Sequence, residues 1–228
     1  MMAARAAAGV LVSVLAVAPA AAHHTGVYTP KDNAITENFK QVKFSTQAGK
    51  FDVALRLYDG GPLRAEMRAR AAALPEGLET RTRAALVAGD AGAAERGFMI
   101  FFVALARDLA RQADRQLAAG AAPAAVGPRF LEAIWRYYNL ADFAVGQRDA
   151  RASVAMRLAY DDAETLARPA SGAPDAARLR ASFGRIAQIL GQLIDTTTPS
   201  NQGGYAPLEP PAQQRGDVRP QLPVRRNS

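Results

Sequence analysis

The feature that most constrains the fold is a stretch of apolar residues at helical spacing in the middle of the chain. Between Ala91 and Ala118 apolar side chains recur every three or four residues, and Asp90 precedes them as a helix N-cap. They are Phe98, Phe101, Phe102, Leu105, Leu109, Ala113 and Leu117. The segment Gly97–Ala106 is apolar on every side, yet it is far shorter than the roughly 20 residues that cross a bilayer. The pattern predicts a long central core helix.

Similar but shorter patterns on both sides of this segment predict more helices. With 49% hydrophobic residues, many of them alanine, and only 7% aromatic residues, the composition favours helix over strand. The expected helices run over residues 33–58, 63–74, 78–87, 128–146, 149–166 and 175–195. The sequence therefore predicts an all-α fold: an up-and-down helical bundle of about four principal helices, preceded by short helices.

Two details of the later helices follow from the same reasoning. Gly120–Gly127 is typical of a loop, so that Pro128 is expected at a helix start. Asp149 is placed to cap the next helix. The residues of that helix expected to face inward are Val154, Leu158, Asp161 or Asp162, and Thr165 or Leu166.

The first 22 residues are typical of a cleavable signal peptide. Arg5 lies in a short N-terminal region, the apolar segment Gly9–Val17 has signal-peptide length, and small residues follow it. Cleavage is expected after Ala20 or after Ala22. The sequence therefore predicts a periplasmic or secreted protein without a transmembrane span once the leader is removed.

The leader implies a division of the chain into four parts. Residues 1–22 form the signal peptide, 23–32 an extended arm, 33–195 the helical-bundle domain and 196–228 a tail. The tail is rich in proline and is expected to be disordered. Its arginines, Arg215, Arg219, Arg225 and Arg226, suggest contact with an anionic surface. The net charge of +7 is spread along the chain, and for an exported protein we expect no nucleic-acid partner.

The chain contains no cysteine, which excludes several classes of protein. Disulfides, thiolate zinc sites, iron–sulfur clusters and cysteine nucleophiles all require that residue. The stability of the fold must therefore come from packing alone.

The two histidines, His23 and His24, are adjacent and lie at the expected new amino terminus. Cleavage after Ala20 would make His23 the third residue, where the amine, two amides and the imidazole form a square-planar copper or nickel site. Cleavage after Ala22 would make it the first residue, where amine and imidazole chelate copper. With no later histidine, a Ser-His-Asp triad and a Glu-x-x-His di-iron motif are excluded.

Carboxylates are the other candidate ligands. Asp161, Asp162 and Glu164 lie close in sequence to a tyrosine and offer oxygen ligands for iron. The alternative interpretation is a solvated helix face. Asp142 is interpreted as the ion-pair partner of Arg136 or Arg148.

One part of the chain is similar to a known group of proteins. Over Ala133–Leu166 an aromatic helix is followed by Gln147-Arg148-Asp149-Ala150 and a second alanine-rich helix. This resembles the extracytoplasmic helical domains that accompany bacterial iron-uptake permeases. The resemblance covers about a fifth of the chain and includes neither the Arg-Glu-x-x-Glu motif of the permeases nor the Gly-x-His-x-x-Glu motif of imelysin-like proteins. It implies a periplasmic helical domain and assigns no site residue.

Three functions remain open from the sequence. The first is a non-enzymatic, exported helical bundle that binds an envelope protein or scaffolds an envelope complex. The second is a metal-binding or metal-delivery protein that uses His23 and His24 for copper or nickel, or the acidic residues for iron. The third is a carboxylate-dependent enzyme that acts on an envelope polymer.

Overall fold

The computed structural model describes residues 31–169 and 172–198, and all its regular structure is helical. The elements are α1 (Ala34–Gln47), α2 (Phe51–Asp59), α3 (Pro62–Ala69), a 3-10 turn (Ala71–Ala73), α4 (Leu78–Ala88), α5 (Ala91–Ala118), α6 (Pro123–Arg148), α7 (Ala150–Ala167) and α8 (Ala176–Thr197). The predicted all-α fold is confirmed. The signal peptide, most of the arm and nearly all of the tail lie outside the described residues.

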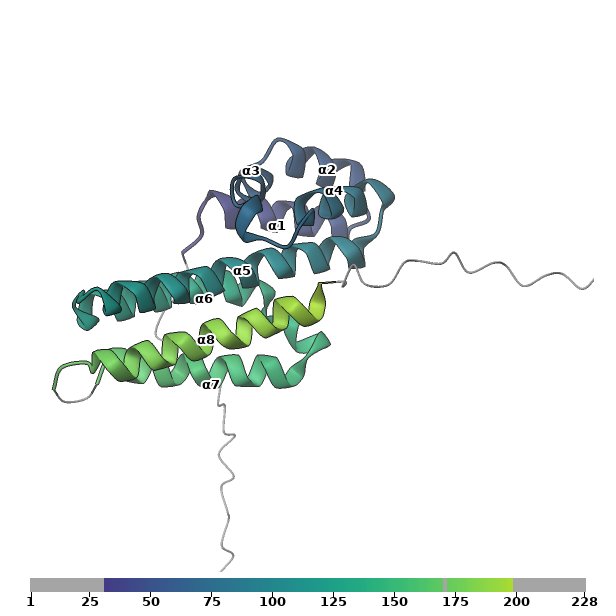
Figure 1. The fold of residues 1–228 in the computed structure, drawn as a ribbon. Coiled ribbons are helices and arrows are strands. Elements are labelled where there is room, and N and C mark those ends of the chain that lie inside the picture. The colour runs from purple at the N-terminus through teal and green to yellow at the C-terminus, as the bar shows by residue number, and fades with distance from the viewer. Residues whose placement is uncertain (1–30, 170–171, 199–228) are drawn as a thin grey trace, which may run out of the picture.

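The helices form two parts that share α5 (Figure 1). Helices α5, α6, α7 and α8 run up and down as a bundle in which α5 and α7 each contact both α6 and α8. Helices α1 to α4 form a layer that covers the N-terminal half of α5. The principal and the short helices are therefore arranged as the sequence predicts.

Helix α5 is buried on every side where the two parts meet. Asp90 caps its first turn by accepting a hydrogen bond of 2.8 Å from Ala93 N. All residues of Gly97–Ala106 are buried, because the bundle covers one side and the front layer covers the other. This position explains why the segment carries no polar face.

The first expected helix, over residues 33–58, is divided in two by a turn. Asn33 and Thr36 form a capping box at the start of α1. After Gln47 the backbone turns at Gly49, whose φ of 71° suits glycine far better than other residues. Helix α2 then starts at Phe51 and folds back on α1.

Helix α6 starts earlier than the sequence suggests, so the prediction for Pro128 is wrong. Pro123 occupies the first turn, where its missing N–H costs nothing, and Pro128 lies inside the helix. Packing holds this segment helical, because Gly127 lies against two other helices. An added Cβ at Gly127 would be 2.8 Å from Ala167 Cβ and 3.2 Å from Leu179 Cδ2.

The inward face of α7 also differs from the prediction. Its buried residues are Ser153, Met156, Ala159, Tyr160, Ala163 and Ala167. Small alanines let α7 approach its neighbours, and Tyr160 is anchored by a hydrogen bond of 3.0 Å to Leu131 O. Val154 and Leu158, expected in the core, are each 56% exposed.

Candidate functional site

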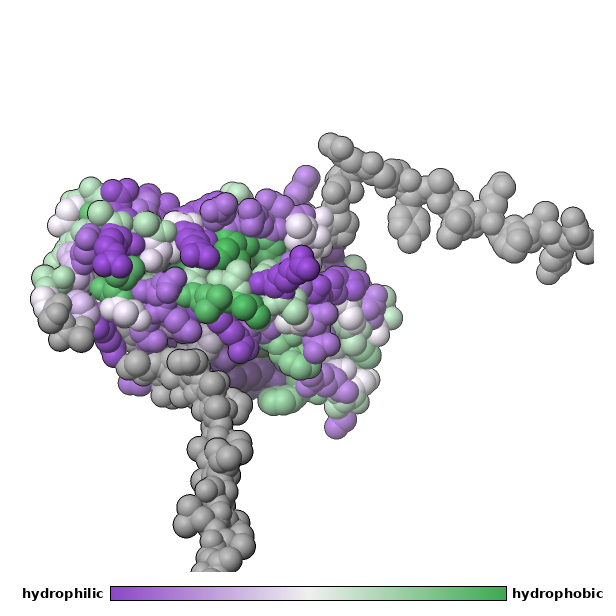
Figure 2. Space-filling model, turned by 90° about the horizontal axis from the view of Figure 1, so that it is seen from below, coloured by the Kyte–Doolittle hydropathy of each residue, from purple (hydrophilic) through white to green (hydrophobic). Residues whose placement is uncertain are grey.

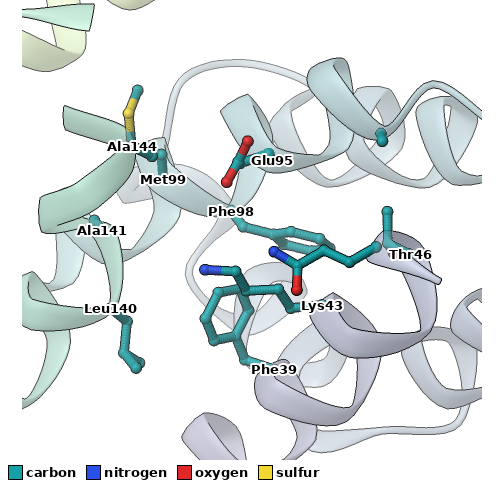
Figure 3. Close-up of a pocket in the computed structure, with 11 residues that line it drawn as sticks. Phe39, Lys43, Thr46, Glu95, Phe98, Met99, Leu140, Ala141 and Ala144 are labelled. Atoms are coloured by element: carbon teal, nitrogen blue, oxygen red, sulfur yellow. The ribbon is translucent and has the colours of Figure 1, made fainter. Parts of the chain in front are cut away.

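A largely apolar groove opens between α1, α5 and α6 (Figure 3). About 480 Å³ of empty space lies between its walls when the part that is open solvent is counted. The residues that line it are Phe39, Lys43, Thr46 and Gln47 from α1, Ala91, Glu95, Phe98 and Met99 from α5, and Leu140, Ala141 and Ala144 from α6. Three helices that are far apart in sequence therefore build one surface.

An aromatic cluster holds the floor of the groove in place. The ring of Phe39 packs edge-on against Phe98, at 5.6 Å between centroids, and against Phe102, at 4.6 Å. Phe102 also stacks on Tyr137 of α6 at 6.1 Å. Edge-on and offset rings pack favourably and restrict each other's rotamers. The floor is therefore preformed.

The rim of the groove adds one charge of each sign. Lys43 Nζ lies 5.9 Å from the centroid of the Phe39 ring, and Glu95 is an exposed residue on the neighbouring α5. The Thr46 hydroxyl donates to Val42 O at 2.9 Å, so that its proton is already used within the helix. The groove thus combines a small, mainly apolar lining with two charges at its edge, which suits binding of apolar groups.

Two exposed phenylalanines lie on the helices that flank this groove. Phe44 of α1 is 67% exposed and Phe143 of α6 is 69% exposed. Large aromatic side chains on a surface are enriched where proteins bind one another. Neither residue lines the groove itself, but each lies on a helix that does.

Of the metal ligands predicted from sequence, only the acidic residues lie in the described structure. His23 and His24 lie outside the described residues, so the copper or nickel site stays a prediction. Asp161, Asp162 and Glu164 lie on the last turns of α7, where Asp162 is exposed. Over residues 31–169 and 172–198 no three acidic or histidine side chains form a group that could hold a metal, and these three acids are no exception.

Asp142 is part of a polar cluster between α6 and α7, with partners other than those predicted. It forms an ion pair with Arg157 and accepts a hydrogen bond of 3.1 Å from Ser153 Oγ. Neither Arg136 nor Arg148 pairs with it. The prediction was wrong because the partner comes from the facing helix, which the local sequence does not show.

Tyr138 lies beside this cluster and is fully buried. Burial raises the pKa of Tyr138 well above its ordinary range, and the Asp142 carboxylate raises that pKa further. The phenol therefore keeps its proton at neutral pH. With Asp142 already bound by Arg157 and Ser153, the arrangement ties α6 to α7.

Comparisons with known protein families, with curated proteins and with solved structures found no match. The resemblance to iron-uptake permease domains thus stays a prediction. In the part of the chain that the structure describes, no helix has both the length and the apolar character needed to cross a membrane.

The sequence analysis did not predict the groove, although the sequence holds one signal of a binding surface on the helices that line it. Phe44 and Phe143 both lie off the apolar stripe of their own helices, and a bulky aromatic residue in such a position has no core to fill. The groove itself arises because α1 and α6 both pack against α5, and this arrangement exists only in the folded chain.

Proposed function

We propose that this protein is an exported, non-enzymatic helical bundle that binds a partner protein of the cell envelope through the groove between α1, α5 and α6. The observation that carries this proposal is the preformed apolar floor made by Phe39, Phe98 and Met99, with Leu140 at its edge. The leader sequence supports export.

Several features favour a protein partner. The exposed Phe44 and Phe143 offer aromatic anchors on α1 and α6, the two outer helices of the groove, and fully desolvated aromatic residues dominate binding energy at protein interfaces. Met99 adds a flexible thioether that adapts to different apolar side chains. Lys43 and Glu95 at the rim would fix the orientation of a partner segment through charge.

A photocrosslinking experiment in the native cell tests the binding surface. A photoreactive phenylalanine analogue replaces Leu140 at the groove in one strain and exposed Val87 of α4 in a matched control strain. We expect one discrete crosslinked product from position 140 and none from position 87. That product should disappear when Phe44→Ala and Phe143→Ala are added. Equal labelling from both positions, or no product from position 140, would contradict the proposal.

The export part of the proposal has its own measurement. Intact mass and N-terminal sequencing of the protein from the native cell should show a chain that begins at Ala21 or at His23. A chain that retains Met1 or Met2 in a cytoplasmic fraction would exclude a periplasmic or secreted function.

A further inference from the structure

The outward face of α7 carries a stripe that is basic at one end, apolar in the middle and acidic at the other. It consists of Arg151, Val154, Leu158, Asp161 and Asp162, at the three- and four-residue spacing of one helix face. We call these five residues the α7 stripe. An apolar pattern of this kind normally faces a core, yet here the buried face of α7 is the opposite one, with Met156, Tyr160 and the alanines.

The middle of the α7 stripe is an apolar surface patch. Val154 and Leu158 are each 56% exposed. Ala155 of α7 and Ile189 of α8 line a shallow depression next to them, and Figure 2 shows a hydrophobic patch in the middle of the face that α7 and α8 form. Nothing in the described chain covers this patch, and contiguous exposed apolar surface marks interaction sites.

The charged ends of the stripe form no ion pair with the described part of the chain. Among residues 31–169 and 172–198, ion pairs form at other positions, while Arg151, Asp161 and Asp162 take part in none of them. Asp161 does affect the pKa of Arg157 one turn earlier, but Arg157 is paired with Asp142. The basic and acidic ends are therefore both available to a second molecule.

We propose that the α7 stripe is the contact between two copies of this chain, whose α7 helices pack antiparallel about a two-fold axis. In that arrangement Val154 of each copy lies against Leu158 of the other. The centre of this register is position 156, midway between 154 and 158. Positions 151 and 161 are each five residues from that centre, so Arg151 of each copy lies against Asp161 and Asp162 of the other. The stripe is thus complementary to itself, as the interface of a two-fold dimer must be.

Charge separates this arrangement from its alternatives. A parallel pair of α7 helices would place Arg151 beside Arg151 and Asp162 beside Asp162, and like charges at such positions oppose pairing. A different protein could bind the stripe whether or not its two ends carried opposite charges. An antiparallel second copy uses every member of the stripe, and this is the reason to assign the surface to it.

The size of the contact indicates the strength of the dimer. Helix α7 is about 27 Å long at 1.5 Å per residue, and α8 adds Ile189 on one flank. A standard interface buries about 800 Å² on each partner, and one helix pair with a single flank lies at or below that size. We expect a reversible dimer with a dissociation constant in the range of about 1–100 µM.

Sedimentation velocity on the purified, processed chain tests the proposal. We expect the wild-type protein to pass from monomer to dimer as its concentration rises through the micromolar range. The variant Val154→Glu/Leu158→Glu should weaken dimerisation at least about tenfold, because it places four like charges at the centre of the contact. Both positions are exposed, so its circular dichroism should match the wild type. The control Val87→Glu on α4, another exposed valine, should leave dimerisation unchanged.

Charge reversal tests the antiparallel register itself. Arg151→Glu alone and Asp161→Arg/Asp162→Arg alone should each weaken the dimer, whereas the combination of all three reversals should restore it. A combination that stays as weak as its parents would overturn the register. If the wild-type chain remains monomeric at about 100 µM, the proposed dimer is wrong. The same conclusion holds if a different protein is found to bind the stripe of such a monomer.

Discussion

Gly97 of α5 lies so close to Thr82 of α4 that a Cβ atom added to the glycine would be 2.1 Å from Thr82 Oγ1 and 3.0 Å from Thr82 Cβ. Both residues are buried. The hydroxyl is held by a hydrogen bond of 2.8 Å to Leu78 O and cannot easily move aside. This close approach sets the distance between the front layer and the bundle, immediately beside Phe98 in the floor of the groove.

Gly97→Ala should therefore destabilise the fold. We expect a loss of about 1–3 kcal/mol in the free energy of unfolding, because the new methyl group pushes α4 away from α5. Urea denaturation followed by circular dichroism measures the change. Gly184 of α8 is the matched control, since an added Cβ there meets nothing within 4 Å. Gly184→Ala should leave stability unchanged or raise it by up to about 1 kcal/mol through helix propensity. Equal losses in both variants would contradict the close-contact explanation.

Asn38 joins α1 to the last turn of α2 and the first turn of α3. Its Nδ2 donates to Leu57 O at 3.1 Å, and its Oδ1 accepts from Leu63 N at 3.1 Å. Asn38→Ala leaves a partly buried carbonyl and a buried amide without this partner, which should cost about 1–3 kcal/mol of unfolding free energy. Asn139 of α6 is exposed and serves as the control, for which we expect a change within about 0.5 kcal/mol. Thermal and urea unfolding of both variants give the comparison.

Asp59 should make the stability of the front layer depend on pH. Arg83 binds its carboxylate through two hydrogen bonds, of 2.9 and 2.8 Å, and Arg64 adds an ion pair of 2.8 Å. The hydrogen bond from Arg83 is the main cause that lowers the pKa of Asp59 below its ordinary value. A lowered folded-state pKa means that the stabilisation is complete above the unfolded-state pKa of about 4 and is lost as pH falls through the folded-state value.

The variant Asp59→Asn turns this into a measurement. At pH 7 it should be less stable than the wild type, and the difference should shrink as the pH is lowered from about 5 to below 3. Asp52→Asn is the control, because Asp52 pairs with Arg56 in a bridge whose two side chains are 71% and 70% exposed. It should differ little from the wild type at any pH. A gap for Asp59→Asn that stays constant down to pH 3 would show that the carboxylate charge does not stabilise this layer.

The helices that could be predicted from the sequence are those whose caps and apolar faces are set by their own residues. Helix α5 starts and ends at the predicted residues, because a capping aspartate and a long apolar pattern act locally. In α8 the stripe of Leu179, Phe183, Ile186 and Leu190 is buried as expected, since only one face of that helix is strongly apolar. Both helices can be predicted without knowing which other helices pack against them.

Helix α7 shows why the rest could not be predicted. Its sequence contains two candidate faces, one with Val154 and Leu158 and one with Met156, Tyr160 and alanines. Side-chain hydrophobicity favours the first face, whereas close packing against α6 and α8 selects the second. The groove is hidden for a related reason: Phe39, Met99 and Leu140 belong to separate helices, and only the fold brings them together.

The two buried tyrosines of the bundle give a final, opposed pair of predictions. Tyr138 OH is buried and makes no hydrogen bond of acceptable geometry to the described residues, whereas Tyr160 OH donates to Leu131 O at 3.0 Å. Removing an unsatisfied buried hydroxyl relieves a desolvation cost, so Tyr138→Phe should be neutral or stabilising by up to about 1 kcal/mol. Tyr160→Phe deletes a made bond and leaves Leu131 O one donor short, and it should cost about 1 kcal/mol or more. Urea unfolding of the two variants measures the difference, and a larger loss for Tyr138→Phe than for Tyr160→Phe would show that the Tyr138 hydroxyl makes a hydrogen bond in solution.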